Sequence, residues 1–200
     1  MTKIKTKTKA AQPVLPAPAP VYQLQVALVE SAPLIWRRVL VVGSLRLATL
    51  HRVLQPVMGW HGAHPYEFDL GGGRYGESGL EVPDRPRLKH AARVTIASAV
   101  GELERFDYVY GAGAGWQHRV QVEAILPPDA GLRTARCVDG ANACPPENSE
   151  GIAAYQALLQ IIADPDHAQH VQELATLGAR FDPGHFDPAE VNRLLARVRE

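Results

Sequence analysis

Apolar and polar positions alternate where the chain first shows a regular pattern. A period of two is typical of a strand with one buried face, so we predict a strand over residues 22–28. A second alternating run follows over 35–42 after a short turn, and the link is too short for a crossover connection. The two runs therefore predict an antiparallel hairpin. The apolar positions of the first run are Tyr22, Leu24, Val26 and Leu28.

Helical spacing replaces this alternation over residues 45–58. Ser44 is expected to cap the helix, and Pro56 and Gly59 mark its end. His51 is expected on the exposed polar face of this helix. The apolar positions lie three and four residues apart, as in an amphipathic helix: Leu47, Leu50, Val53, Leu54, Val57 and Met58.

Three further strands are predicted over 66–70, 105–110 and 116–125. The last two alternate cleanly, and the segment 111–115 between them contains only glycine and alanine, which suits a wide hairpin turn. Residues 74–92 are polar and interrupted by prolines, so they are predicted to form a long loop.

The pattern after residue 150 is helical. One helix is expected over 152–162, and a second is expected to begin with Asp164 as its cap and Pro165 as its first residue, ending at Gly178. Asp187 opens a capping-box spacing that predicts a third helix. Strands come first and helices last, an order that favours an α+β fold over a parallel sheet.

The predicted fold class is therefore α+β, with a twisted antiparallel sheet crossed by one amphipathic helix and C-terminal helices packed on it. We assign residues 21–200 to a single domain, and a hydrophobic fraction of 46% is enough to close a core. Residues 1–20 are rich in proline and alanine, and we expect them to be a disordered basic tail.

Charge is unevenly distributed between this tail and the body. The whole chain has 21 basic and 21 acidic residues, and removing the four tail lysines leaves the body with 17 basic residues against 21 acidic ones. The tail is either a solubilising leader without a partner or a weak electrostatic contact for nucleic acid or an anionic membrane surface. No segment is long and apolar enough to span a membrane. The tail lysines are Lys3, Lys5, Lys7 and Lys9.

Cysteine content indicates the compartment. Only Cys137 and Cys144 are present, which is too few for a secreted disulfide scaffold. The basic amino terminus lacks the apolar core of a signal peptide. We therefore predict a cytoplasmic protein.

A series of motifs runs through most of the body in a fixed order. The motifs are Ile35-Trp36-Arg37-Arg38-Val39, residues 47–60, His64, Phe68, Tyr108, Tyr110, Gly113, Trp116, His118, Cys137-Val138-Asp139-Gly140, Cys144-Pro145-Pro146-Glu147, Gly151 and Tyr155. Together they resemble the plasmid pRiA4b ORF-3-like family, known as insertion-sequence passenger proteins of TnpR type. The resemblance covers about residues 22–192 and implies the family's fold and a mobile-element origin.

The chain departs from this family in its acidic motifs. The family's Tyr-Asp-Phe-Gly-Asp is Tyr110-Gly111-Ala112-Gly113-Ala114 here, and its Pro-Pro-Glu-Asp ends in Asn148. A hard divalent cation such as Mg²⁺ needs several converging carboxylate oxygens, and three acidic positions are empty. The departures therefore favour an inactive site, or one that never was catalytic.

The remaining matched residues include ligand types that zinc accepts. Thiolate, imidazole and carboxylate all occur in zinc sites, but six residues separate the two cysteines, which is not a zinc-knuckle spacing. We expect no cofactor and retain zinc or another divalent metal as the alternative. The candidate ligands are His64, His118, Cys137, Cys144 and Glu147.

The three tryptophans and the Arg37-Arg38 pair have structural and functional interpretations. Trp36, Trp60 and Trp116 are expected to fill core volume, with stacking on nucleic-acid bases as the alternative. Arg37 and Arg38 point to opposite faces if 35–42 is a strand. One is expected to be solvated, and the other to form an ordinary salt bridge, with Glu147 or a ligand anion as the other possible partner.

The sequence predicts a non-catalytic binding or accessory protein of mobile-element origin, with an unknown protein or a small ligand as partner. The expected cleft lies between segments 61–68, 111–118 and 137–151. One alternative is a metal-dependent hydrolase or nuclease that uses His64, His118, Asp139 and Glu147. Another is a DNA-associated regulator that binds phosphates through the tail lysines. The cleft candidates are Arg37, Trp60, His64, Tyr110, Trp116, His118, Asp139 and Glu147.

Overall fold

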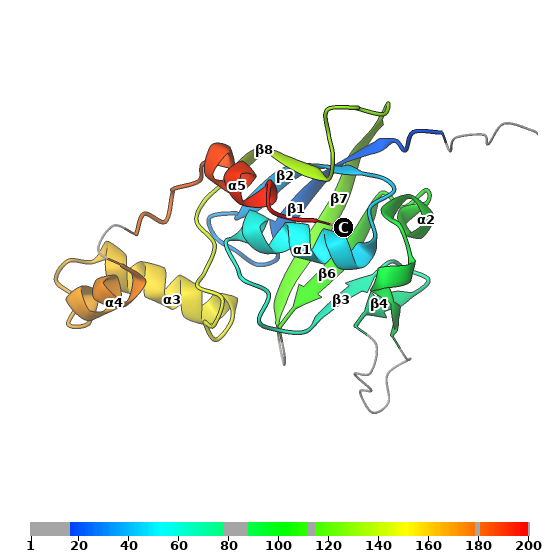
Figure 1. The fold of residues 1–200 in the computed structure, drawn as a ribbon. Helices are drawn as coiled ribbons and strands as arrows, with labels where there is room; N and C mark the ends of the chain where they lie inside the picture. Colours follow the sequence, from blue (N-terminus) through cyan, green and yellow to red (C-terminus); the bar gives the residue numbers. More distant parts are fainter. Residues whose placement is uncertain (1–16, 78–87, 112–114, 179–180, 200) are drawn as a thin grey trace, which may run out of the picture.

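An eight-stranded sheet forms the centre of the protein (Figure 1). The computed structural model describes residues 17–77, 88–111, 115–178 and 181–199. The strands lie side by side in the order β5-β4-β3-β6-β7-β1-β2-β8. Their bounds are β1 (Val21–Leu28), β2 (Trp36–Val42), β3 (Tyr66–Asp69), β4 (Arg74–Gly76), β5 (Lys89–His90), β6 (Arg105–Tyr110), β7 (Trp116–Leu126) and β8 (Ala135–Ala141).

The predicted α+β class is confirmed. The expected hairpin of β1 and β2 and the expected pairing of β6 with β7 are both present and antiparallel. Neighbouring strands are antiparallel except β4 and β5, which run parallel for two residue pairs. The helices are α1 (Leu47–Met58), α2 (Ile96–Val100), α3 (Ile152–Ala163), α4 (His170–Leu177) and α5 (Pro188–Leu195), with a short 3-10 turn at Ala91–Arg93.

Helix α1 crosses one face of the sheet, as Figure 1 shows, and its apolar side forms the middle of the core. Arg46, not Ser44, precedes the helix, and it makes no side-chain cap. The Ser44 prediction is wrong because a backbone contact replaces the cap: the Leu47 amide donates to the carbonyl of Val94 at 3.0 Å. The helix ends as expected after Pro56, where Gly59 adopts a left-handed φ of 81°.

The prediction of a long loop over 74–92 is wrong, and one strand was not predicted. The supposed loop 74–92 contains β4 and β5, and β4 is held by its register with β3 and by an ion pair between Arg74 and Glu67. Residues 78–87 of that segment lie outside the described residues. Strand β8 was not predicted, because its pairing with β2 joins residues about a hundred positions apart and its alternation is short.

The free edge of β8 is covered by α5. Asn192 on α5 accepts a hydrogen bond from the Cys137 amide at 2.8 Å and donates one to the Cys137 carbonyl at 2.7 Å. Helix α5 begins as predicted, with the Asp187 carboxylate accepting from the Ala189 amide at 2.7 Å. The side-chain amide of Asn192 therefore pairs with β8 as a neighbouring strand would.

Helices α3 and α4 pack against each other beside the sheet, at the left in Figure 1. Asp164 ends α3 instead of opening the next helix, and its carboxylate accepts from the Asp166 amide at 3.0 Å. Helix α4 therefore begins at His170, not at Pro165, and it ends before Gly178 as predicted.

The helices and the amino-terminal segment were also subjects of prediction. None of the helices in the described part of the chain has the length and apolarity to cross a bilayer. Of the predicted tail, residues 1–16 lie outside the described residues, and residues 17–20 form neither helix nor strand.

Candidate functional site

Four of the predicted cleft residues line one cavity of about 340 Å³. His64 comes from the loop after α1, Tyr110 and Trp116 from the facing ends of β6 and β7, and Glu147 from the loop after β8. The rest of the described lining is Gly111, Gly115 and the segment 148–151, which leads into α3. Residues 112–114 of the predicted glycine and alanine turn lie outside the described residues.

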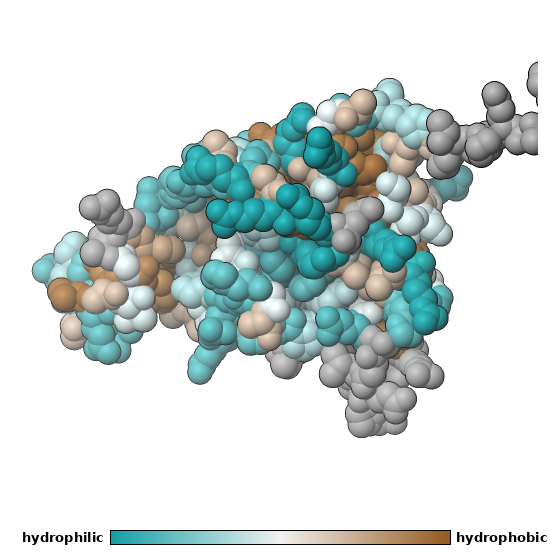
Figure 2. Space-filling model, viewed as in Figure 1, coloured by the Kyte–Doolittle hydropathy of each residue, from teal (hydrophilic) through white to brown (hydrophobic). Residues whose placement is uncertain are grey.

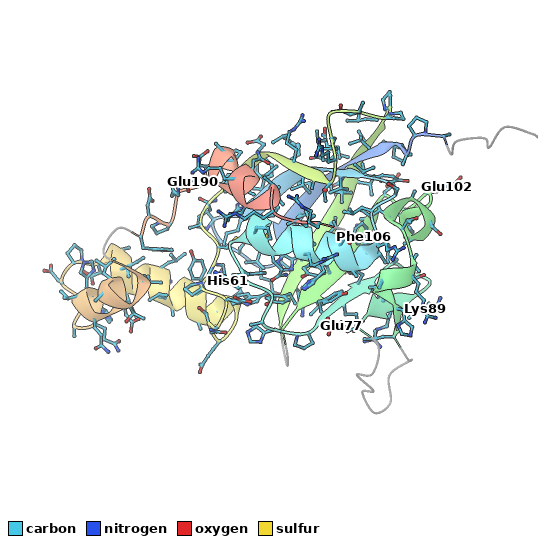
Figure 3. All side chains as sticks on the ribbon, in the orientation of Figure 1. His61, Glu77, Lys89, Glu102, Phe106 and Glu190 are labelled. Carbon is cyan, nitrogen blue, oxygen red and sulfur yellow. The ribbon has the colours of Figure 1, made fainter. Side chains whose placement is uncertain are left out.

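The Glu147 carboxylate is held by the loop after α1. Its Oε1 atom accepts from the amides of Gly62 and Ala63, both at 3.1 Å, and from the phenol of Tyr110. Its Oε2 atom accepts from the His61 amide at 3.0 Å and lies 3.3 Å from Nδ1 of the same residue. Three successive backbone N–H groups therefore converge on one carboxylate, which is the geometry of an anion-binding nest. Figure 3 shows His61 on this loop, on the side that faces α3.

These contacts shift the pKa values of Glu147 and Tyr110. Burial alone would raise the pKa of Glu147, but hydrogen bonds from Tyr110, Ala63 and His61 outweigh it and lower this pKa to about 2. Burial and the bond to Glu147 raise the pKa of Tyr110 to about 12. At neutral pH the pair is therefore a carboxylate and a neutral phenol.

Two buried tryptophans fix the loop that carries Glu147. Trp60 Nε1 donates to the Pro145 carbonyl at 2.9 Å, and Trp116 Nε1 donates to the Glu147 carbonyl at 3.1 Å. The two indoles stack with ring centroids 5.7 Å apart, and both are 4% exposed. Both rings therefore fill core volume as predicted and anchor the cavity wall through their N–H groups.

The loop 59–64 owes its shape to glycine. Gly62 has a φ of 81°, in the left-handed region that side chains disfavour, and this turns its amide toward Glu147. The next residues continue the network: the His64 amide donates to the Tyr110 hydroxyl at 3.2 Å, and His64 Nε2 lies 3.0 Å from Asn148 Oδ1. One loop thus supplies donors to two walls of the cavity.

A buried polar cluster lies between α1 and the sheet and was not predicted. His51 Nδ1 and Gln55 Nε2 each lie 2.8 Å from the Tyr108 hydroxyl, and the His51 ring stacks on Tyr66 at 3.8 Å. The expectation that His51 is exposed is wrong, since the residue is 8% exposed. Its partners on β3 and β6 are distant in the sequence, so helical spacing alone assigns it to the polar face.

His118 lies beneath Trp60 and does not reach the cavity. Its Nδ1 donates to the Tyr108 carbonyl at 3.2 Å, whereas its buried Nε2 has no hydrogen-bond partner among the described residues. Burial lowers the pKa of His118 to about 4 and that of His51 to about 4. Both rings are therefore neutral at physiological pH.

Arg37 and Arg38 face opposite sides of β2, as predicted, but the expected division into one solvated arginine and one arginine in a salt bridge is wrong, because the outward residue makes the salt bridges and the inward one binds carbonyls. The outward Arg38 makes salt bridges, at 2.6 Å to Glu123 and 3.3 Å to Asp139. The inward Arg37 donates to the carbonyls of Val57, Trp36, Ala141 and Asn142 at 2.8 to 3.0 Å, and to the sulfur of Cys144 at 3.1 Å. Within the described residues, no carboxylate lies within salt-bridge distance of Arg37.

Arg37 is thus a buried structural cation that joins α1, β2 and the loop after β8. Its guanidinium stacks 4.0 Å from the ring centroid of Phe186, and burial lowers its pKa. It is absent from the lining of the cavity beside Glu147, and so is Asp139, whose side chain is 55% exposed. Trp36 differs from the other tryptophans: it is half-buried, and the Arg38 guanidinium lies 5.2 Å from its ring.

The candidate metal ligands do not converge. Burial raises the pKa of both Cys137 and Cys144 to about 11, and Cys144 contacts Arg37 instead of a second metal ligand. His118 is enclosed in the core and Glu147 is bonded to backbone amides. In the described ranges, no three side chains of His, Cys, Asp or Glu form a group that could hold a metal ion.

Comparison with known proteins gives a consistent picture. The family model for plasmid pRiA4b ORF-3-like proteins matches residues 20–190. The uncharacterised protein y4hQ of Sinorhizobium fredii is 35% identical over 180 residues, which is 88% of this chain and 91% of that protein. A crystal structure of a protein of unknown function, MM3350 from Methanosarcina mazei, has a TM-score of 0.77 at 30% identity and covers 86% of this chain and 96% of that one.

Proposed function

The chain belongs to the plasmid pRiA4b ORF-3-like family, and we propose that it is a non-catalytic accessory protein that binds a small ligand in the cavity beside Glu147. The TnpR-type label and the mobile-element role stay predictions.

The proposal depends chiefly on the hydrogen bonding of Glu147. A general base needs a free lone pair and a pKa near the working pH. Both oxygens of this carboxylate are occupied by donors, and its pKa of about 2 makes it a weak base. The same donors occupy the positions through which the carboxylate would coordinate a metal. Glu147 therefore acts as a structural anion that closes the loop 61–63 onto the cavity wall.

The metal-dependent hydrolase is less well supported. It requires His64, His118, Asp139 and Glu147 to act on one substrate, but only His64 and Glu147 line the same cavity. The pKa of about 12 for Tyr110 also makes this phenol a poor general acid or base at neutral pH. The three acidic positions that the family resemblance suggests are occupied here by Gly111, Ala114 and Asn148.

The lining of the cavity indicates the kind of ligand. The lining combines the rings of His64, Tyr110 and Trp116 with the polar residues Asn148, Ser149 and Glu150. Aromatic rings with a few polar groups among them are typical of sites for small organic molecules. We therefore expect a ligand with an apolar ring or chain and one polar end.

Ser149→Phe tests the cavity as the binding site. Ser149 lines the cavity, so a phenylalanine ring there would occupy part of its volume, and Ser44→Phe provides a control on an exposed turn outside the cavity. A library of small metabolites is screened by thermal shift and by tryptophan fluorescence. We expect compounds that stabilise the wild type and Ser44→Phe but not Ser149→Phe. Hits that stabilise all three proteins equally would contradict the proposed site.

A second measurement tests the absence of catalysis. The wild type and Glu147→Gln are assayed for hydrolysis of ester, phosphodiester and nucleic-acid substrates with added Mg²⁺, Mn²⁺ or Zn²⁺. We expect no turnover above buffer in either protein. Turnover by the wild type that Glu147→Gln abolishes, with the variant still folded, would contradict the proposal.

A further inference from the structure

A second concave surface, of about 510 Å³, carries an arginine cluster that the proposed function does not use. Arg133 precedes β8, Arg136 lies in β8, and Arg199 follows α5; all three are exposed and line this surface. We propose that this arginine surface binds the phosphate backbone of a nucleic acid, independently of the cavity beside Glu147.

The local charge of the surface is positive although the whole chain is neutral. No aspartate or glutamate occurs among its described lining residues. None of Arg133, Arg136 and Arg199 forms an ion pair with another described residue, although Arg199 donates to the Ala196 carbonyl at 2.7 Å. Their charges are therefore not neutralised by neighbouring carboxylates in the described part of the protein.

The fold brings these arginines together from two distant parts of the sequence. Asn192 binds the backbone of Cys137, which places the C-terminal end of α5 next to the start of β8. Each segment also contributes a buried side chain beside the arginines, Leu132 before β8 and Leu195 at the end of α5. Figure 2 shows hydrophilic residues gathered over α5 and toward the end of the chain.

One further arginine extends the charge past the end of α5. Arg197 follows the helix and is exposed, whereas Arg193 on the helix is exposed but pairs with Glu190 at 3.6 Å. Glu190 lies on the N-terminal turn of α5 (Figure 3), so its negative charge is displaced from the cluster. The positive surface therefore continues beyond the concavity at Arg197.

The described chain enters the folded body at the same edge. The Gly43 amide donates to the Pro20 carbonyl at 2.7 Å, and the adjacent Val42 amide donates to the Thr134 carbonyl at 3.1 Å. Thr134 itself lines the arginine surface. Pro20, the residue immediately before β1, therefore lies at the edge of the sheet that carries Thr134 and the arginine surface.

Exposed arginines on an open surface suit a chain of phosphates better than a single small anion. A small anion requires donors that converge on one point, as the amides do around Glu147. Guanidinium groups on an open surface can instead each make a bidentate contact to one of several successive phosphates. Binding of this kind releases counterions and weakens steeply as salt increases.

The test compares the full chain with Arg133→Gln/Arg136→Gln. Arg105→Gln/Arg119→Gln is the matched control, because it also removes two exposed arginines, from a concavity that contains Glu102 and Glu104. Fluorescence anisotropy measures the affinity for labelled duplex DNA, single-stranded DNA and RNA over a range of NaCl concentrations. The logarithm of the binding constant falls linearly with the logarithm of the salt concentration, and each lost phosphate contact reduces the magnitude of this negative slope by about 1.

We expect the wild type to bind at least one of these nucleic acids with a steep salt slope. For Arg133→Gln/Arg136→Gln the magnitude of that slope should be smaller by about 2, and for the control it should be unchanged. Equal slopes for this variant and the wild type would overturn the proposal. Absence of nucleic-acid binding at about 50 mM NaCl would overturn it too. Phosphatidylserine vesicles are tested separately, and binding to these vesicles without binding to any nucleic acid would also overturn the proposal. Thermal shift of the Glu147 cavity by its own ligands is unaffected by these substitutions, so the two proposals fail separately.

Discussion

Tyr110 donates its phenolic hydrogen to Glu147 across 37 residues of sequence, and this bond closes the wall of the candidate cavity. The same carboxylate oxygen accepts from the Gly62 and Ala63 amides. Tyr110 lies in the sheet and Glu147 in a loop, so the bond fixes a loop to a rigid strand. The stability of this wall is therefore linked to the charge of one carboxylate.

Replacing Glu147 should test that link. In Glu147→Gln one acceptor oxygen becomes an NH₂ group that faces amide donors, so at least one buried donor loses its partner. We expect a loss of about 1–3 kcal/mol in the free energy of unfolding at pH 7, measured by urea denaturation. Glu150→Gln removes an exposed carboxylate from the same segment and should change this free energy by less than about 0.5 kcal/mol.

The pH dependence separates charge from shape at this position. The pKa of Glu147 lies at about 2 in the folded protein, below its ordinary value of 4.5. Its stabilisation is therefore fully present above pH 4.5 and is lost as pH falls through about 2. The difference in unfolding free energy between wild type and Glu147→Gln should shrink over this window. A difference that stays constant down to pH 2 would show that the carboxylate charge is not involved.

Arg37 should be far less tolerant of substitution than its neighbour. Lysine cannot replace a guanidinium that donates to several carbonyls, including those of Val57 and Ala141, so Arg37→Lys leaves buried acceptors unpaired. We expect a loss of about 3 kcal/mol or more, against about 1 kcal/mol or less for Arg38→Lys. Chemical denaturation of the two variants provides the comparison, and similar losses would contradict the structural role of Arg37.

Gly140 is required for space and not for backbone conformation. A Cβ atom there would lie 2.5 Å from Phe186 and 2.7 Å from the Trp36 carbonyl. We expect Gly140→Ala to cost about 1–3 kcal/mol by overpacking β8 against Phe186 and β2. Gly72→Ala is the matched control because nothing lies within 4 Å of its Cβ position. The midpoint temperature of thermal unfolding should therefore be lower than that of the wild type for Gly140→Ala and unchanged for Gly72→Ala.

His118 should make the protein sensitive to mild acid. Its pKa of about 4 lies below the ordinary 6.5, so the folded state favours the neutral ring. The stability is full above pH 6.5 and falls as pH decreases toward 4, because the unfolded state binds the proton more readily. His118→Phe keeps a ring edge-on to Trp60 and removes the titration. Its unfolding free energy should decline less between pH 6.5 and 4 than that of the wild type, by the order of 1 kcal/mol.

Much of the fold could be predicted because local patterns agree with tertiary packing. Alternation identified β1, β2, β6 and β7, and helical spacing identified α1, since each of these segments buries one regular face. Strands β4 and β8 could not be predicted in this way. They depend on partners far away in the sequence, and β8 buries little more than Cys137 along its length.

The candidate site was predicted in part for a similar reason. Tyr110, Trp116 and His64 are recognisable as motif residues, and the structure brings them together with Glu147. Their use in ligand binding stays a prediction. The backbone amides of 61–63 carry no signal in the sequence, because every residue type other than proline has one. The one signal in the sequence is Gly62, because a glycine permits the turn at which these amides converge.

The contact between Asn192 and Cys137 has a consequence for the behaviour of the protein in concentrated solution. An unprotected outer strand presents free N–H and C=O groups, which other chains can extend into a continuous sheet. Here a side-chain amide already occupies that position on β8, and β5, at the opposite margin, is only two residues long. Polymerisation through β-augmentation is thus disfavoured at both margins, and at β8 a single asparagine does what a longer covering segment does in other folds.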